Sequence, residues 1–358
     1  MQSALTWSLI VPTYNRRNII LEALRHAATQ TRKPQEIIVV DSSLDAAETK
    51  RLVEDELAIV HCDIEWKYLF SSNRSAAIQR NEGLDHCTGD IVFFIDDDCF
   101  MYPDYAQIVM EVFEADADGH YAGLQGSLAD APPDPQAQPA RPISSVRRSL
   151  WQRIRNKTYW FWVQHIILET TLGLFCPYRG GYPRHELPSL GLPYTFLPRR
   201  FLEGCRCVYP RQVITDLKFD ADLLYYSIAE DLDVSYRVSF TGAIAEVAEA
   251  KIFHCHYPSA RPEQYVRSLT GFTNQAFWIK KHNKASLRVR IGFYLRMLRH
   301  IPSRFVYDLS QARWELPRVR GIMAAFRPVF QIFSLAPETL SAWYRDFQRN
   351  TYARYHRD

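Results

Sequence analysis

The sequence predicts an α/β protein whose mostly parallel central sheet is flanked by helices and followed by a helical C-terminal region. Short β-branched and apolar runs alternate with segments of helical periodicity through the first 130 residues. Strands separated by helices of 10–15 residues are typical of a parallel sheet covered on both faces. From Pro262 onward the chain is predicted to be helical.

The elements of the first half follow one another in a regular order. Its predicted strands are the apolar runs at residues 6–11, 36–40, 64–70 and 91–95. Between the first two strands, apolar residues recur at helical spacing: Ile19, Ile20, Ala23, Leu24, Ala27 and Ala28. Helices are also predicted over 45–57 and 73–86, and Pro103 opens another from its first-turn position.

Residues 130–200 are predicted to be an insertion. Its first part, 130–145, carries five prolines and is typical of a surface loop. The aromatic segment 158–178 is interpreted either as a buried helix or as a helix docked at a membrane interface beside the preceding arginines. A membrane span is disfavoured because it would place Glu169 near the bilayer centre.

Composition and charge limit the class of protein. Hydrophobic residues make up 47% and charged residues 23% of the chain, which is typical of a folded globular protein. We expect one domain over 1–260 and a basic helical region over 261–358. Residues 1–130 have 22 Asp and Glu against 10 Lys and Arg, whereas 261–327 have 14 Lys and Arg against 3 Asp and Glu. This asymmetry indicates an acidic half that holds a metal and a basic half that faces something anionic.

Targeting signals and cysteines point to the cytoplasm. No run of about 20 apolar residues and no secretory signal is recognised. The seven cysteines, an odd number, do not suggest a disulfide framework. For the basic region, three interpretations stay open: a solvated surface, peripheral contact with anionic lipid at the inner membrane face, and contact with an anionic acceptor. Nucleic acid is disfavoured because no nucleic-acid-binding signature is present.

Two strand ends in the first half are candidate ligand sites. Pro12, Thr13, Tyr14 and Arg16 follow the first strand, and Asp41 follows the second. Ligands of open α/β sheets bind beyond the carboxyl ends of the strands, and a carboxylate there accepts hydrogen bonds from a base or ribose. The alternative for each is an ordinary strand-to-helix turn.

The fourth predicted strand ends in three aspartates, Asp96, Asp97 and Asp98. Adjacent like charges repel one another unless a cation lies among them, and carboxylate oxygens suit Mg²⁺ or Mn²⁺. Alternation along a strand predicts that Asp96 and Asp98 face one side and Asp97 the other. A solvated acidic turn is the alternative.

Two later segments carry further ionisable groups. Glu230 and Asp231 open a predicted helix, where they are either a catalytic base or acids favoured by the helix dipole. His254 and His256 follow the predicted strand 243–253, as metal ligands or as ordinary partly buried histidines. A zinc site with Cys205-x-Cys207 is a poor match because zinc cysteines are usually farther apart in sequence.

In order and spacing, these parts resemble the inverting glycosyltransferases of family 2, which have the GT-A fold. The resemblance covers about residues 6–260. Its parts, in order, are VPTYNR at 11–16, Asp41, the helix from Asn73 that ends in Arg80, Asn81 and Gly83, Thr88-Gly89-Asp90, Asp96 to Asp98, Glu230-Asp231 and a late strand histidine.

The resemblance implies a role for each matching residue. The first loop and Asp41 would hold the nucleotide base and ribose; Arg80, Asp96 and Asp97 would also contact the nucleotide-sugar. Asp98 and His256, or alternatively His254, would hold a divalent metal (Mn²⁺ or Mg²⁺). Asp231 would be the catalytic base, with Glu230 as the other candidate.

The sequence departs from the family pattern at three places. The turn after Asp41 is one residue short, which affects contacts with the donor base. Ser75 stands where glycine is usual. The Gln-x-x-Arg-Trp motif of processive synthases is missing after Glu230-Asp231, which favours a single-addition enzyme.

The expected function is metal-dependent, inverting transfer of a sugar from a nucleotide-diphospho-sugar to a hydroxyl group of a glycan or a lipid-linked acceptor. A sugar nucleotidyltransferase is disfavoured because the first loop lacks the expected glycines. A dinucleotide oxidoreductase is disfavoured because no G-x-G-x-x-G follows a strand. A non-catalytic sugar-nucleotide or glycan-binding module is the remaining alternative, and it would lack the paired metal and base carboxylates.

Overall fold

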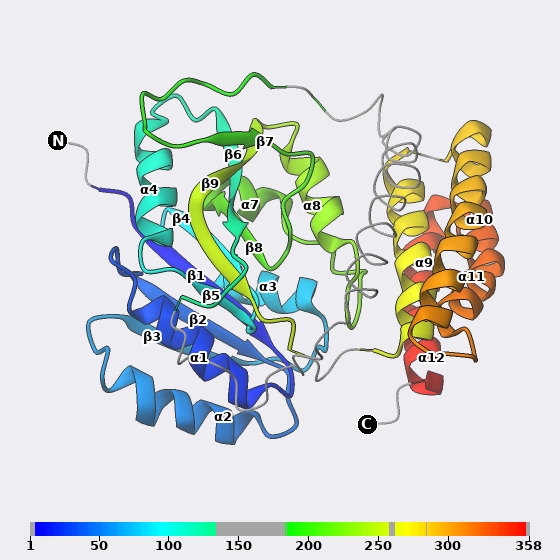
Figure 1. The fold of residues 1–358 in the computed structure, drawn as a ribbon, viewed down its shortest axis with the longest axis horizontal. Helices are drawn as coiled ribbons and strands as arrows, with labels where there is room; N and C mark the ends of the chain where they lie inside the picture. The colour runs from blue at the N-terminus through cyan, green and yellow to red at the C-terminus, as the bar shows by residue number, and fades with distance from the viewer. Residues whose placement is uncertain (1–3, 134–182, 184, 258–261, 284, 356–358) are drawn as a thin grey trace. The chain divides into compact units, whose positions relative to one another are not determined.

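We describe the protein from a computed structural model that places residues 4–133, 183, 185–257, 262–283 and 285–355 (Figure 1). The chain divides into two compact units. The N-terminal unit comprises residues 1–143 and 183–260, and the helical unit comprises residues 144–182 and 261–358. The predicted aromatic segment 158–178 and most of the Pro-rich loop lie outside the described residues.

The N-terminal unit is built on a nine-stranded sheet. Its strands are β1 (Trp7–Thr13), β2 (Glu36–Asp41), β3 (Glu65–Phe70), β4 (Ile91–Ile95), β5 (Cys99–Met101), β6 (Tyr121–Leu128), β7 (Phe196–Pro198), β8 (Arg206–Pro210) and β9 (Ala243–His254). They follow the order β3-β2-β1-β4-β8-β6-β9-β5, with β7 paired to β9. The first four in this order are mutually parallel. The other half is mixed, since β8 is antiparallel to β4 and β6 while β6 is parallel to β9.

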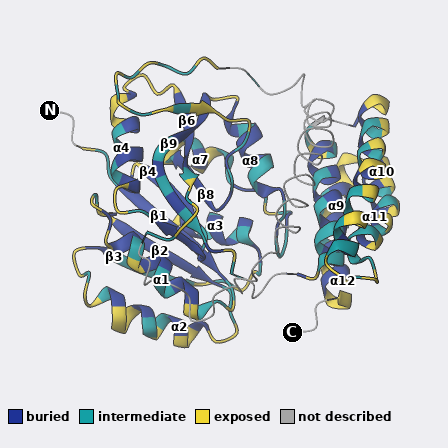
Figure 2. Cartoon of the chain, in the orientation of Figure 1, coloured by how far each residue is buried: buried dark blue, intermediate teal, exposed yellow. Residues whose placement is uncertain are grey.

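Helices cover both faces of this sheet. They are α1 (Arg17–Ala28), α2 (Ala46–Val53) with a π-helical turn (Glu54–Ala58), α3 (Ala76–Asp85), α4 (Tyr105–Ala115), α7 (Arg211–Leu217) and α8 (Glu230–Val238). Alternate residues of one strand separate the two cores: Leu9 of β1 packs with α1 and α4, whereas Ile10 packs with α3, α7 and α8. The α/β prediction is confirmed, and Figure 2 shows the strands as the buried centre of this unit.

The predicted and observed elements agree best where periodicity is strong. β1, β2 and β4 are buried at every residue, as central strands should be, and the six residues that predicted the first helix are all buried in α1. The strands β5 to β8 were not predicted. β5 and β7 are only three residues long, and β6 contains Gly123 and Gly126, which weaken a strand signal.

The helical unit contains α9 (Gln264–Asn283), α10 (Leu287–Ser310), α11 (Pro317–Ser334) and α12 (Pro337–Tyr355). Aromatic rings join these helices: Phe293 of α10 lies edge-on to Phe333 of α11 at 5.5 Å, and Phe277 of α9 stacks on Tyr344 of α12 at 4.4 Å. The buried Asp308 accepts hydrogen bonds from the backbone and guanidinium of Arg318 at 2.9 and 2.8 Å. Among the described helices, none has the length and hydrophobicity needed to cross a bilayer.

A buried histidine in α10 should make the helical unit sensitive to acid. His300 lies edge-on to Phe272 at 5.4 Å, and burial, with help from Arg296 and Arg304, lowers its pKa to about 3. The unfolded chain takes up this proton near pH 6.5, so the unfolding free energy falls as the pH drops below that value, by at most about 1.4 kcal/mol per pH unit. In His300→Phe this contribution disappears. We expect urea unfolding of the variant, followed by circular dichroism, to lose less stability between pH 7 and pH 5.

The exposed His86 provides the matched control for this prediction. His86→Asn should keep the acid sensitivity of the wild type. If His300→Phe kept it too, His300 would not be its source.

Candidate active site

The predicted strand-end residues gather at one edge of the sheet. β1, β2 and β4 are parallel neighbours, and Thr13 pairs in register with Asp41 at their carboxyl ends. Gln79 of α3 fixes this edge, because its side-chain amide donates hydrogen bonds to the carbonyl oxygens of Thr13 and Val40 at 2.9 and 2.8 Å. Ligands of open α/β sheets bind at such an edge.

Asp41 stabilises the loop after β2. Its carboxylate accepts hydrogen bonds from the backbone N–H and hydroxyl of Ser43, at 2.7 and 2.5 Å, and from the Tyr68 hydroxyl at 2.5 Å. Burial and the Asp41 charge raise the pKa of Tyr68 well above its usual range. The Ser43 hydroxyl in turn accepts a hydrogen bond from the N–H of Asn15, which has a left-handed φ of 50°. The loops after β1 and β2 are therefore tied together.

An arginine stacked on a tyrosine ring and a surface pocket lie beside these loops. The Arg74 guanidinium covers the Tyr14 ring at 3.8 Å from its centroid. The pocket, of about 390 Å³, is lined by Arg16, Leu44 and Tyr257, among others. Arg74 was not predicted as a site residue, although it belongs to the quoted helix motif. Its position directly after the polar segment Ser71-Ser72-Asn73 is the sequence signal that could have indicated it.

The three aspartates form a turn and not a continued strand. Asp97 accepts hydrogen bonds from the Thr13 hydroxyl and the Arg16 guanidinium, both at 2.7 Å, and Arg16 also lies 3.4 Å from Asp98. Asp96 instead pairs with Arg80 at 2.8 Å. The alternation prediction is therefore wrong, because the turn places Asp97 and Asp98 against one arginine and Asp96 against another.

Charge within this turn is compensated by the partly buried Arg16 and the buried Arg80. Burial raises the pKa of Asp97 to about 6, Arg16 opposes this shift, and the neighbouring Asp98 adds to it. Asp97 is buried, whereas the Asp96 side chain is 32% exposed. Of the two, Asp96 is the carboxylate open to a ligand.

Arg80 connects the aspartate turn to the Glu-Asp pair. Its side chain is only 2% exposed, and its guanidinium donates hydrogen bonds to Glu230 at 2.7 Å, Asp96 at 2.8 Å and the Gly204 carbonyl at 3.0 Å. Gly204 lies so close that a Cβ atom there would be 3.0 Å from Glu230 and 3.2 Å from Arg80. This buried fork joins residues 150 positions apart in the chain.

The Glu-Asp pair opens α8 with both carboxylates near the same loop. Burial raises the pKa of Glu230 to about 8, the charge of Asp231 adds to this shift, and Arg80 opposes it. Asp231 accepts hydrogen bonds from the N–H groups of Gly204 at 3.2 Å and Leu232 at 2.8 Å. Burial also raises its pKa. Asp231 is thus held by backbone amides, while Glu230 is held by a cation.

The late histidine His254 contacts the aspartate turn. Its Nε2 lies 3.2 Å from Asp98 Oδ1, and the other oxygen of Asp98 accepts the Tyr257 N–H at 2.9 Å. His256 is exposed, has a left-handed φ of 54°, and its ring centroid lies 3.9 Å from that of His254. This backbone turn ends the strand geometry that would have placed both histidines on one face.

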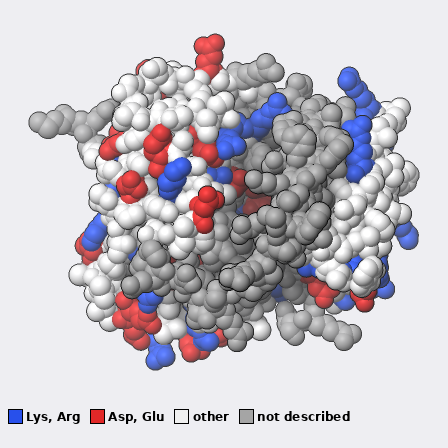
Figure 3. Space-filling view, viewed as in Figure 1, with Lys and Arg blue, Asp and Glu red and all other residues white. Residues whose placement is uncertain are grey.

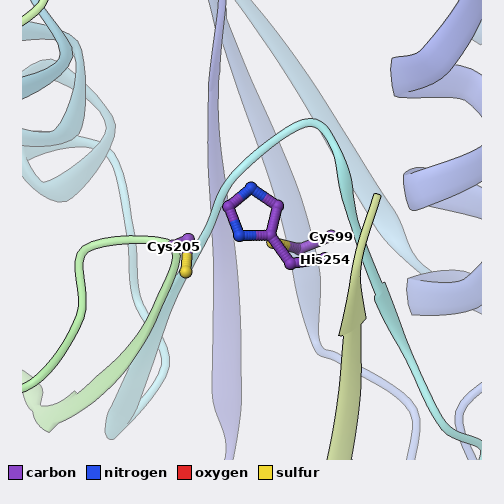
Figure 4. Close-up of side chains that lie close together, drawn as sticks. All are labelled: Cys99, Cys205 and His254. Atoms are coloured by element: carbon purple, nitrogen blue, oxygen red, sulfur yellow. The ribbon is translucent and has the colours of Figure 1, made fainter. Parts of the chain in front are cut away.

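Two cysteines complete the surroundings of His254. Figure 4 shows Cys99 and Cys205 beside the imidazole, and the ligand atoms of the three residues lie within 4.8 Å of one another. Cys207 packs in the core on the other face of the sheet, with Phe94 and Tyr209. The neighbouring thiols are therefore Cys99 and Cys205, and Cys207 is not part of this group, in agreement with the poor match of Cys205-x-Cys207 to a zinc site. Thiols suit Zn²⁺, whereas the oxygens of Asp98 suit Mn²⁺ or Mg²⁺.

The parallel half of the sheet ends in acidic turns, and the other half is mixed and lies beside the Glu230-Asp231 pair. This arrangement defines a GT-A nucleotide-sugar transferase fold. The model of glycosyl transferase family 2 matches residues 8–175. This match lies mostly within the N-terminal unit, whose fold and site are consistent with a family 2 glycosyltransferase.

Comparisons with known proteins agree with this family. An uncharacterised glycosyltransferase of Rickettsia conorii is 31% identical over 109 residues, 30% of this chain and 17% of that protein. The GalNAc(5)-diNAcBac-PP-undecaprenol β-1,3-glucosyltransferase of Campylobacter jejuni is 34% identical over 93 residues, 25% of this chain and 29% of that protein. The chain thus matches less than a third of either relative. A mannosyltransferase from Pyrobaculum calidifontis, solved with GDP-Man and Mn²⁺, has a TM-score of 0.51 and 16% identity, covering 98% of this chain and 85% of that one, and so shares the fold.

Proposed function

We propose that the protein transfers a sugar from a nucleotide-diphospho-sugar to a hydroxyl acceptor, with inversion at the anomeric carbon and one sugar added per reaction. The observation that carries this proposal is the Arg80 fork, which holds Asp96 and Glu230 within the reach of a single side chain. Because Asp96 and helix α8, which carries Glu230 and Asp231, both contact the buried Arg80, they are close enough to act on the same donor sugar.

Asp231 is the proposed general base. An acceptor hydroxyl attacks poorly until its proton is removed, and a carboxylate positioned to take that proton accelerates the reaction. Glu230 is committed to Arg80, whereas Asp231 is bound by two backbone N–H groups and keeps lone pairs for the acceptor. The raised pKa of Asp231 strengthens it as a base at neutral pH. Direct attack by the acceptor inverts the anomeric carbon.

The loops after β1 and β2 are the proposed nucleotide site. Tyr14, with Arg74 above it, offers a planar surface for a nucleobase, and Asp96 offers an exposed carboxylate to the ribose. Thr13, Asp41 and Asp97 are buried and hold the loops in place through the hydrogen bonds described above, and Pro12 is buried in β1 beside them. We assign them positioning roles. Arg16 forms an ion pair with Asp97 and also lines the pocket beside these loops.

Asp98 and His254 are the proposed holders of a divalent cation, with His256 as the alternative histidine. The 3.2 Å between Asp98 Oδ1 and His254 Nε2 is about the separation of adjacent ligands on one ion with bonds of 2.0–2.2 Å. An imidazole donor favours Mn²⁺ over Mg²⁺, and the Pyrobaculum mannosyltransferase was solved with Mn²⁺. Such an ion would offset the negative charge that develops on the departing diphosphate.

The proposed acceptor is a glycan or a lipid-linked sugar, reached by peripheral contact at the cytoplasmic membrane face. The Campylobacter relative is named for an undecaprenol-linked acceptor. The surplus of Lys and Arg over residues 261–327 supports an anionic partner.

Release of nucleoside diphosphate tests the proposed reaction. The full chain is incubated with Mn²⁺ and a panel of UDP-, GDP- and dTDP-sugars, with and without EDTA. We expect at least one donor to be hydrolysed, hydrolysis to stop with EDTA, and Mn²⁺ to restore it. A panel without any metal-dependent release would contradict the proposal.

A binding measurement tests the metal ligands separately. By Mn²⁺ electron paramagnetic resonance, His254→Ala should weaken Mn²⁺ binding by about tenfold or more, whereas the matched variant His256→Ala should change it little. The reverse result would assign the ion to His256.

A further inference from the structure

Helix α10 is apolar on two faces. Its buried face carries Val289, Phe293 and Met297, which pack inside the helical unit. The opposite side also carries large apolar side chains, each between 43% and 73% exposed: Leu287, Ile291, Leu295, Leu298, Phe305 and Val306. We call these six residues the outer face of α10. Figure 2 shows exposed residues along this helix.

The outer face is continuous. At 100° per residue its members fall within an arc of about 100°, and at 1.5 Å per residue they extend over about 29 Å. A helix on the surface of a globular unit normally presents polar residues to water on this side. An exposed apolar strip of this length marks an interaction site.

Positive charge accompanies the outer face. Arg288 and Arg299 are exposed and fall at one edge of the same arc. α10 contains five arginines, and its single acidic residue, Asp308, is buried against Arg318. On the neighbouring α11, exposed Arg320, Met323, Arg327 and Phe330 repeat the alternation of arginine and apolar residues. In Figure 3 the surface over α10 and α11 is largely uncharged, with Lys and Arg side chains along its border and some Asp or Glu side chains at its lower end.

We propose that the outer face of α10 docks on a membrane surface that contains anionic lipid. An apolar strip bordered by arginines is the composition of a helix that lies in the plane of a membrane interface, with its apolar side chains among the acyl chains and its cations at the head groups. Pairing with a second copy of this face would bring the same arginines together. This proposal gives a surface to the membrane contact in the proposed function, but it concerns binding, which is measured without donor or metal.

Flotation of the full chain with lipid vesicles tests the docking surface. Vesicles of phosphatidylcholine with phosphatidylglycerol at low salt should carry the protein, and high salt or pure phosphatidylcholine should reduce the bound fraction. The triple variant Ile291→Ser, Leu295→Ser and Leu298→Ser should bind the vesicles at least about tenfold more weakly than the wild type. Arg288→Gln with Arg299→Gln should bind about 25-fold more weakly, since each arginine near the surface contributes about fivefold.

Matched exposed residues on the N-terminal unit control for general hydrophobicity. Leu44 and Ile59 are 86% and 71% exposed, so Leu44→Ser with Ile59→Ser should float like the wild type. Thermal unfolding should be similar for all variants, because the substituted side chains face solvent.

Three results would each overturn the proposal. The first is no flotation of the wild type at low salt. The second is equal flotation of both α10 variants and the wild type. The third is that analytical ultracentrifugation finds a dimer for the wild type and a monomer for the variant of Ile291, Leu295 and Leu298. The outer face would then be a contact between two copies of the chain. Loss of vesicle binding with normal donor hydrolysis would leave the proposed reaction in place.

Discussion

Asp231→Asn is expected to slow sugar transfer by about 10²–10⁴-fold with little change in donor binding. The amide cannot take a proton from the acceptor, although its oxygen can still accept a hydrogen bond from Gly204 or Leu232. Single-turnover transfer at saturating donor measures the first effect, and calorimetric titration of the donor measures the second. Because burial raises the pKa of Asp231, the wild-type rate should also start to fall at a higher pH than for an exposed aspartate as the solution is acidified.

Asp118, in an exposed loop of the same unit, offers the control. Asp118→Asn should transfer sugar at the wild-type rate. If Asp231→Asn kept the wild-type turnover, Asp231 would not be the general base. Glu230 would then be the candidate, and loss of transfer in Glu230→Gln would support it.

Arg80→Gln is expected to lower the unfolding free energy by about 3–5 kcal/mol, the usual cost of removing one partner of a buried ion pair. Asp96 and Glu230 lose their shared cation, and Glu230 is left buried beside Asp231. Without Arg80 the pKa of Glu230 rises further, so its protonated form stabilises the folded variant at low pH and this stabilisation is lost as the pH rises. The deficit should therefore be larger at pH 8.5 than at pH 5, as measured by urea unfolding. Donor hydrolysis should also be lost, because the fork no longer aligns the two carboxylates.

A double variant separates this pairing from a general packing defect. Arg80→Gln with Glu230→Gln removes both partners and should recover part of the lost stability. Arg25→Gln, at an exposed ion pair on α1, should cost less than about 1 kcal/mol. Equal costs for the single and double variants would show that Arg80 is not stabilised by Glu230.

Strong periodicity made the first half of the fold predictable. The buried set of α1 and the fully buried, mainly apolar strands β1, β2 and β4 follow from local spacing alone. The short strands β5 and β7 and the glycine-containing β6 were not predicted, because each forms only where a long partner strand supplies its hydrogen bonds. Most of the mixed half of the sheet thus depends on pairing with β9.

The candidate site was predictable as a set of residues but not as a set of contacts. Asp41, Asp96 and Glu230 stand at strand or helix ends that the pattern locates. Which carboxylate meets which cation depended on the turn at Asp97 and on a left-handed residue at His256, where side-chain alternation no longer applies. The structure places His254 Nε2 3.2 Å from Asp98 Oδ1.

The sequence by itself determined the α/β class, the parallel strands and the acidic and histidine groups at their ends, because these follow from periodicity within a few neighbouring residues. Only the tertiary structure decided that Arg80 joins Asp96 to Glu230, that Cys99 meets Cys205 beside His254, and that α10 keeps an apolar face in water. Such contacts join segments far apart in the chain, and local periodicity carries no record of which distant segment will pack against which.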